Sequence, residues 1–228
     1  VGTVSLPVLS NAFKQKNISM ISKIQSKSIE LSLLLSIPAS VGLIIASDEI
    51  VSALFGYGSF TLESSRLTAL ALKFFGYGVP AFALIKILSN FFFARNDTKT
   101  PFYISSFIVL LNILISVTLF NEYGFIIIPI ATSISTWTGV LIYIAVLNKK
   151  KSLMLKNYLI KNIIMIILIT ILMTFILVFI LDFYSIYLDY TYRYKSIYLL
   201  LIVGFVAGFY LISCYLSGVL RKENFKTN

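Results

Sequence analysis

Histidine is absent from this 228-residue sequence, and cysteine occurs once, as Cys214. A metal site built on imidazoles or paired thiolates is therefore excluded, as is a disulfide framework. Charged residues make up 12% of the chain, against about 25% in soluble domains. No paired carboxylates suited to general acid–base chemistry stand out, and Asp97 has no acidic neighbour. We therefore expect no enzyme.

Apolar residues dominate instead, at 58% of the chain and a mean hydropathy of +0.93. A helix needs about 20 apolar residues to cross roughly 30 Å of hydrocarbon. Backbone polar groups must be paired inside a membrane, and these runs are too long for barrel strands. The sequence thus predicts an all-α, polytopic transmembrane bundle of six spans, at Ile29–Ser47, Leu67–Phe93, Phe102–Asn121, Phe125–Leu147, Asn157–Leu181 and Ser196–Leu220.

Prolines fall inside three of these predicted spans, at Pro38, Pro80 and Pro129. Each removes a helix hydrogen bond and predicts a local kink. A neighbouring helix or a hydroxyl side chain should bond to each freed carbonyl.

Basic residues gather in alternate connections between the spans. The net charge of +10 is divided among short segments, so membrane topology explains it better than nucleic-acid binding. Arg66, Arg193 and Lys195 lie on one side, which we expect to face outward. The opposite side, with both chain ends, should be cytoplasmic; it carries Lys14, Lys16, Lys23, Lys27, Arg95, Lys99, Lys149, Lys150, Lys151, Lys156, Lys161, Arg221, Lys222 and Lys226.

The sequence divides into four parts. Residues 1–28 are expected to hold the end of a preceding span and a basic cytoplasmic connector. Residues 29–151 hold four spans, residues 152–220 two peripheral, lipid-facing spans, and residues 221–228 a cytoplasmic tail. The tyrosine-rich stretch Asp182–Lys195 suits the headgroup level of a bilayer. Because the chain opens at Val1 without a leader, we interpret it as a fragment.

Two lysines, Lys73 and Lys86, lie within a predicted span, where ionisable groups are candidates for function. Each is roughly 10 Å from an end of the span, so it can either snorkel to the interface or face an aqueous cavity. In the second case it would attract an anionic substrate.

Three polar residues form a second candidate site, since the short loop Asn121–Gly124 makes two spans antiparallel neighbours. Asn112 and Ser116 then share a face at the depth of Thr132 on the partner span. They can act as structural hydrogen bonds between helices or as a substrate or cation site, with Asn112 the candidate substrate contact.

Several stretches resemble the MurJ (MviN) family of lipid II flippases, within the superfamily of multidrug and oligosaccharidyl-lipid exporters. They are VSLPVLS at Val4–Ser10, SIPASVGL at Ser36–Leu43, LFGYGSF at Leu54–Phe60, and Leu70–Lys86 leading into FARNDTKTP at Phe93–Pro101. In the last, we expect Thr100 to cap the following helix and Pro101 to occupy its first turn.

The resemblance implies a fold and an activity. The six spans would be spans nine to fourteen of a two-lobe transporter that flips lipid II, a polyprenyl-pyrophosphate-linked saccharide, by alternating access. The missing first lobe would hold most of the arginines thought to engage the pyrophosphate, and the last two spans would provide a groove for the lipid tail. Some members bind sodium, for which Asn112, Ser116 and Thr132 occupy matching positions, although Ser116 stands where an acid can occur. No cofactor is expected beyond a coupling sodium ion or proton.

Two other functions remain open at this level. One is an exporter of another polyprenyl-linked saccharide or of drugs, and the other is a membrane scaffold that gathers cell-wall enzymes. A drug exporter would not interact with lipid II, whereas a scaffold would keep its function after substitution of Lys86 or Asn112.

Overall fold

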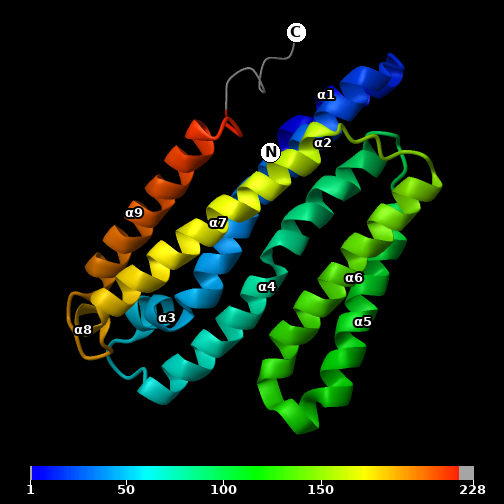
Figure 1. Ribbon diagram of the computed structural model, residues 1–228. Helices are drawn as coiled ribbons and strands as arrows, with labels where there is room; N and C mark the ends of the chain where they lie inside the picture. Colours follow the sequence, from blue (N-terminus) through cyan, green and yellow to red (C-terminus); the bar gives the residue numbers. More distant parts are fainter. Residues whose placement is uncertain (1, 221–228) are drawn as a thin grey trace. The chain divides into compact units, whose positions relative to one another are not determined.

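The computed structural model describes residues 2–220, and within them every regular element is a helix, as expected (Figure 1). The elements are α1 (Gly2–Lys14), α2 (Ile18–Ile45), α3 (Ser47–Phe55), α4 (Leu62–Phe93), α5 (Lys99–Tyr123), the 3-10 helix η1 (Gly124–Ile126), α6 (Ile127–Lys149), α7 (Tyr158–Phe183), α8 (Ser185–Leu188) and α9 (Lys195–Leu216). The predicted tail, residues 221–228, lies outside the described residues, with its three basic side chains.

Five helical stretches of the described chain are long and apolar enough to cross a membrane. One of them, Lys99–Lys149, is a hairpin in which α5 and α6 lie side by side (Figure 1). Gly124 turns the chain between them with a φ of 63°. The six predicted spans therefore correspond to α2, α4, α5, α6, α7 and α9, and the predicted antiparallel pairing of two of them is confirmed.

The basic connector before the first predicted span is more ordered than expected. Helix α2 begins at Ile18 rather than near Ile29, so most of the connector continues the spanning helix. No proline or glycine interrupts the chain between Lys16 and Pro38, and helices tolerate lysine and glutamine well. The short helix α3, which follows α2 after one residue, was not predicted because nine residues do not cross a membrane.

The hydrogen bonds around Pro80 show how α4 continues through a proline. Pro80 has no N–H for the carbonyl of Gly76, one turn earlier. The hydroxyl of Ser40 on α2 donates to that carbonyl at 2.7 Å. The next carbonyl, on Tyr77, accepts a 2.9 Å hydrogen bond from the indole N–H of Trp137 on α6. The predicted pairing of a freed carbonyl by a neighbouring hydroxyl is confirmed here.

The chain forms two compact units, each assembled from separate segments. Unit 1 comprises residues 1–36 and 77–163, and unit 2 comprises residues 37–76 and 164–228. The division expected from the sequence follows consecutive residue ranges, whereas α2, α4 and α7 each contribute to both compact units. Shared spanning helices thus join the two units covalently.

Each unit has its own packed interior. In unit 1, Phe92 and Tyr143 are buried with ring centroids 5.7 Å apart. In unit 2, Ile166 on α7 and Cys214 on α9 are fully buried. Lipid tails are as apolar as these side chains, so close packing rather than water exclusion holds such helices together.

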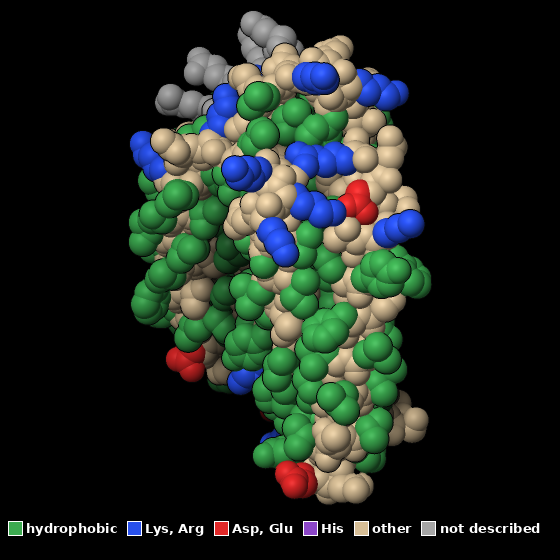
Figure 2. All heavy atoms as spheres, turned by 90° about the vertical axis from the view of Figure 1, so that its right-hand side faces the viewer, with side chains coloured by type: hydrophobic (Ala, Val, Ile, Leu, Met, Phe, Trp, Pro, Cys, Tyr) green, Lys and Arg blue, Asp and Glu red, His purple; other side chains and the backbone are tan. Residues whose placement is uncertain are grey.

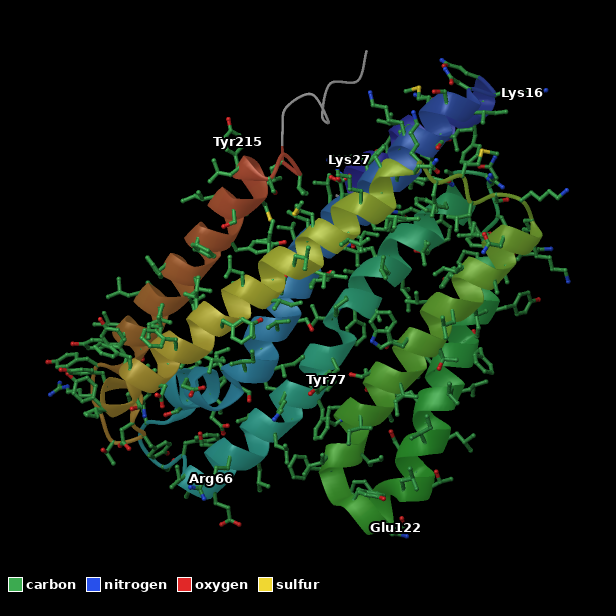
Figure 3. The ribbon with its side chains drawn as sticks, in the orientation of Figure 1. Lys16, Lys27, Arg66, Tyr77, Glu122 and Tyr215 are labelled. Atoms are coloured by element: carbon green, nitrogen blue, oxygen red, sulfur yellow. The ribbon has the colours of Figure 1, made fainter. Side chains whose placement is uncertain are left out.

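Charge is unevenly distributed along unit 1. Lys16 and Lys27 lie at one end and Glu122 at the tip of the hairpin lies at the other (Figure 3). On the face where α5 and α6 lie, Lys and Arg side chains gather at one end above a hydrophobic surface (Figure 2). This distribution is that expected of a bundle whose basic loops share one side of a bilayer.

Candidate functional site

The predicted polar cluster on the α5–α6 hairpin is present. The amide nitrogen of Asn112 donates to the hydroxyl of Thr132 at 2.9 Å, and the Ser116 hydroxyl donates to the amide oxygen of Asn112 at 3.2 Å. The Thr132 hydroxyl in turn donates to the carbonyl of Ile128 at 2.7 Å. All three side chains are half-buried. The cluster links two helices and presents three neutral oxygens, the donor type that sodium prefers.

Lys73 and Lys86 both lie on α4, but in different units. Both side chains are exposed, and neither ammonium has a hydrogen bond or ion pair within the described chain. Within the described part of unit 1, no hydrogen bond joins Lys86 to the Asn112 cluster. Both ammonium groups remain available to an anion or to lipid headgroups.

The FARNDTKTP motif places a carboxylate at the start of α5. Asp97 accepts hydrogen bonds from the Thr100 backbone N–H at 3.0 Å and from the Thr100 hydroxyl at 2.8 Å. The expectation that Thr100 caps this helix is wrong: α5 begins at Lys99, and Asp97 supplies the capping oxygen while Thr100 lies in the first turn. Pro101 occupies the first turn as predicted.

Asp97 also pairs with a lysine that follows α6. The Lys150 ammonium lies 2.7 Å from the second carboxylate oxygen of Asp97 and also donates to the Thr100 hydroxyl at 3.1 Å. The hydrogen bond from Lys150 is the main reason that the pKa of Asp97 falls to about 2, and the bonds from Thr100 add to it. This pair connects the α4–α5 loop to the α6–α7 loop.

A second polar network holds the same two loops within unit 1. The Arg95 guanidinium donates to the hydroxyl and to the carbonyl of Ser152, and it stacks 4.4 Å from the ring centroid of Phe13. Burial lowers the pKa of Arg95 from its ordinary value. On α2, Gln25 donates to the Ser152 carbonyl at 3.1 Å and accepts from the Met154 N–H at 2.8 Å. The motif is therefore a junction between α2 and two loops.

A buried lysine in unit 2 escaped sequence reasoning, which counted Lys195 only as an outward charge. Its side chain is 1% exposed, and its ammonium donates to the carbonyls of Gly56, at 2.9 Å, and Tyr190. The rings of Tyr57 and Tyr190 lie 4.8 Å and 4.4 Å from it. The surrounding tyrosines were a sequence signal, since aromatic faces attract cations. This contact joins the end of α3 to the start of α9.

An apolar cleft of about 500 Å³ opens between the last two long helices, within unit 2. Phe179, Phe183 and Ile180 line it from α7, and Tyr198, Leu201 and Phe205 line it from α9. Much of the remaining surface of α7 is exposed and apolar, including Phe175 at 70% and Ile160 at 67%. These helices present an apolar surface, and the cleft suits a hydrocarbon chain; that the two spans face lipid stays a prediction.

Comparison with known proteins gives one consistent family. A family model described as "Lipid II flippase MurJ" matches residues 1–203. A protein of Rickettsia prowazekii named "Probable lipid II flippase MurJ" is 39% identical over 135 residues, which are 59% of this chain and 27% of that protein. A protein of the same name from Borreliella burgdorferi is 30% identical over 215 residues, 94% of this chain and 42% of its own length.

A solved structure agrees with the sequence matches. "Lipid II flippase MurJ, inward closed conformation" superposes with a TM-score of 0.75 at 27% identity, covering 97% of this chain and 43% of the solved chain. The chain therefore spans less than half the length of each of these three proteins.

Proposed function

Because the chain belongs to the MurJ family of lipid II flippases, we propose that it is the carboxy-terminal part of a transporter for the lipid-linked peptidoglycan precursor. In this proposal the whole protein moves the precursor from the inner to the outer leaflet of the bacterial cytoplasmic membrane by alternating access. The main support for this proposal is the family match over residues 1–203. These residues include helices α2 to α7 and most of the residues that line the apolar cleft between α7 and α9. The protein is a multi-pass membrane protein, and flipping needs no covalent chemistry.

The residues of this chain would contribute in three ways. The apolar cleft between α7 and α9 suits the polyprenyl tail, since its wall is made of aromatic and aliphatic side chains. Lys73 and Lys86, unpaired and exposed, would attract the pyrophosphate. The pyrophosphate itself would be held by a first lobe that precedes this part of the family's sequence. The lysine-rich end, with both termini of the chain, would face the cytoplasm.

A coupling cation is a separate part of the proposal. Asn112, Ser116 and Thr132 offer three neutral oxygens at one depth, which fits part of a sodium site, and the rest of its ligands would come from outside this chain. When bound, the ion would supply charge compensation during the conformational change. The three side chains bond to one another here, so binding would require Asn112 to turn its amide oxygen toward the ion.

The direct test uses the full-length protein in cells depleted of their own flippase. We expect it to restore lipid II translocation, measured by the accessibility of the precursor to an external enzyme. A protein expressed at normal levels that leaves the precursor inside would contradict the assignment. Competition in vesicles separates the alternative, because an exporter of drugs or of other saccharides would transport its own substrate unaffected by lipid II.

A further inference from the structure

A polar pocket of about 710 Å³ lies inside unit 2, where α3, the first turn of α4, α8 and the loop after it meet. Its charged lining consists of Asp48, Glu49, Arg66 and Asp189. Leu181 and Leu188 form part of its apolar wall. This pocket is separate from the apolar cleft between α7 and α9, with which it shares no lining residue.

The charges that face the pocket are not neutralised by one another. No ion pair joins Arg66 to any of the three carboxylates within the described chain, and Arg66 projects from the start of α4 (Figure 3). The Asp189 carboxylate accepts hydrogen bonds from the Thr191 N–H and hydroxyl at 2.9 Å and 2.6 Å, and among the described residues the Glu49 carboxylate has a hydrogen bond only from its own backbone N–H. Asp48 and Glu49 are adjacent, and burial followed by the nearby Asp48 charge raises the pKa of Glu49.

Two buried atoms in the pocket wall lack hydrogen-bond partners. One is the Oε2 atom of Glu49 and the other is the Oγ atom of Ser52, a residue whose exposed fraction is 7%. A buried carboxylate oxygen that accepts no hydrogen bond costs free energy, and no donor within the described residues offsets this cost for Glu49. Both atoms lie on the same turn of α3, at i and i+3, and so they share a face.

These features specify the chemistry of an occupant. A carboxylate oxygen requires an N–H or O–H donor, and two adjacent carboxylates favour a cation. A divalent metal is a poorer fit, since nowhere in residues 2–220 do three acidic, histidine or cysteine side chains converge as a metal site would need. A primary ammonium supplies three N–H donors and a positive charge. The unpaired guanidinium of Arg66 favours a phosphate on the same ligand.

We propose that this pocket binds a phosphoethanolamine group, with the ammonium at Glu49, Asp48 and Ser52 and the phosphate at Arg66. The group occurs as a phospholipid headgroup and as a soluble phosphomonoester, and the pocket recognises the part that both share. Its position at the ends of the membrane-length helices α4 and α7 places it at headgroup level. The proposal concerns a ligand other than the transported precursor, and it stands whether or not the protein flips lipid II.

The test measures binding to the purified full-length protein in phosphatidylcholine nanodiscs. Phosphatidylethanolamine added to the nanodiscs and soluble O-phosphoethanolamine are titrated separately, and bound molecules are counted by native mass spectrometry. Phosphocholine is the chemical control, because its quaternary nitrogen has no N–H to donate. Binding of the lipid alone identifies the membrane as the source, and binding of both compounds identifies the headgroup as sufficient. Binding of neither, or equal binding of phosphocholine, overturns the proposal.

Variants locate the site. Glu49→Gln removes a charge at nearly constant shape, and Ser52→Ala removes the unpartnered hydroxyl without disturbing an existing hydrogen bond. Each should weaken phosphoethanolamine binding roughly tenfold, about the effect of losing one hydrogen bond to a charged group. Glu122→Gln, which removes an exposed carboxylate at the tip of the α5–α6 hairpin, should leave binding unchanged. An equal loss in Glu122→Gln, or full binding in both pocket variants, would contradict the assignment.

Discussion

Asp97 performs two functions at the start of α5, and they can be separated by substitution. Asp97→Asn keeps an oxygen for the Thr100 N–H but removes the ion pair with Lys150, so we expect a loss of about 0.5–1 kcal/mol in unfolding free energy. Asp97→Ala also removes the cap, and its loss should reach about 1–2 kcal/mol. Denaturant unfolding in detergent micelles measures both. Lys149→Ala, on an exposed side chain next to Lys150, is the control.

The same pair predicts a pH dependence. The pKa of Asp97 is lowered to about 2 in the folded protein, chiefly by the hydrogen bond from Lys150, and it is 3.8 ordinarily. A carboxyl whose pKa is lower in the folded protein than in the unfolded chain stabilises the fold at pH values above the unfolded-state pKa. That contribution is lost as the pH falls through the folded-state pKa. The stability difference between the natural protein and Asp97→Asn should therefore be constant above about pH 5, shrink as the pH falls toward 2, and vanish near about pH 1. A difference of unchanged size near about pH 1 would show that the charge is not its cause.

Asn112 distinguishes a transport site from a structural contact. In the full-length protein, Asn112→Leu should impair transport more than Ser213→Leu, because the amide links two spanning helices while Ser213 lies on α9, outside this cluster. Transport and unfolding should be measured on the same preparations. A loss of transport at unchanged stability indicates a substrate or cation site, and a parallel loss of both indicates a structural contact. Equal activity of the two variants would remove Asn112 from the candidate residues.

Contacts between side chains could be predicted from the sequence where the depth of each residue along its membrane span determines which residues meet. Asn112, Ser116 and Thr132 meet because a short loop fixes the register of two antiparallel helices. Lys195 was not predictable in the same way, because its partners are carbonyls of Gly56 and Tyr190, and carbonyl positions are not encoded in residue type. The Asp97–Lys150 pair likewise joins residues 53 positions apart across two loops. Loop geometry, unlike span depth, follows no simple period.

At the level of helices, the hydrogen bond from Ser40 to Gly76 is the most direct test of packing around a proline. Ser40→Ala should cost about 1–2 kcal/mol, because the Gly76 carbonyl then has neither the Pro80 N–H nor a hydroxyl. Ser36→Ala is a matched control on the same helix: both serines are 6% exposed, but the Ser36 hydroxyl has no hydrogen-bond partner. Thermal unfolding in micelles measures the difference.

A double-mutant cycle tests the cause. In Pro80→Ala the new N–H can bond to the Gly76 carbonyl within α4, so Ser40→Ala should then cost less than in the natural protein. An unchanged cost in the Pro80→Ala background would mean that Ser40 acts through another contact.

The helices themselves were largely predictable, since length and hydropathy fix which segments can span a bilayer. The errors fall where hydropathy carries no information. Helix α2 extends into a basic segment, and α3 is short and lies outside the spans. On α9, Gly204 and Gly208 have the spacing that permits close helix packing, but a Cβ at either glycine would meet no described atom of another helix within 4 Å. Small residues permit close helix packing, but they do not specify a partner.

At the scale of the whole molecule, two compact units share three spanning helices, α2, α4 and α7. Two of the shared helices contain a proline near a division: Pro38 on α2 lies close to residues 36–37, and Pro80 on α4 lies close to residues 76–77. Proline weakens a helix locally, so α2 and α4 each have a weakened turn next to the division, whereas α7 divides at residues 163–164 without a proline.

The orientation can be tested with single cysteines in the full-length protein, once Cys214, the one cysteine of this chain and a buried residue, and any cysteine outside this chain are replaced by serine. In a Cys214→Ser background, Glu122→Cys at the hairpin tip should react with a membrane-impermeant maleimide in intact cells. Lys149→Cys, at the opposite end of α6, should react only after the membrane is permeabilised. Both variants must label fully in detergent, which shows that each thiol is accessible. Labelling of Lys149→Cys in intact cells, with Glu122→Cys protected, would invert the topology and place the lysine-rich loops outside, where the basic residues of short loops are rarely found.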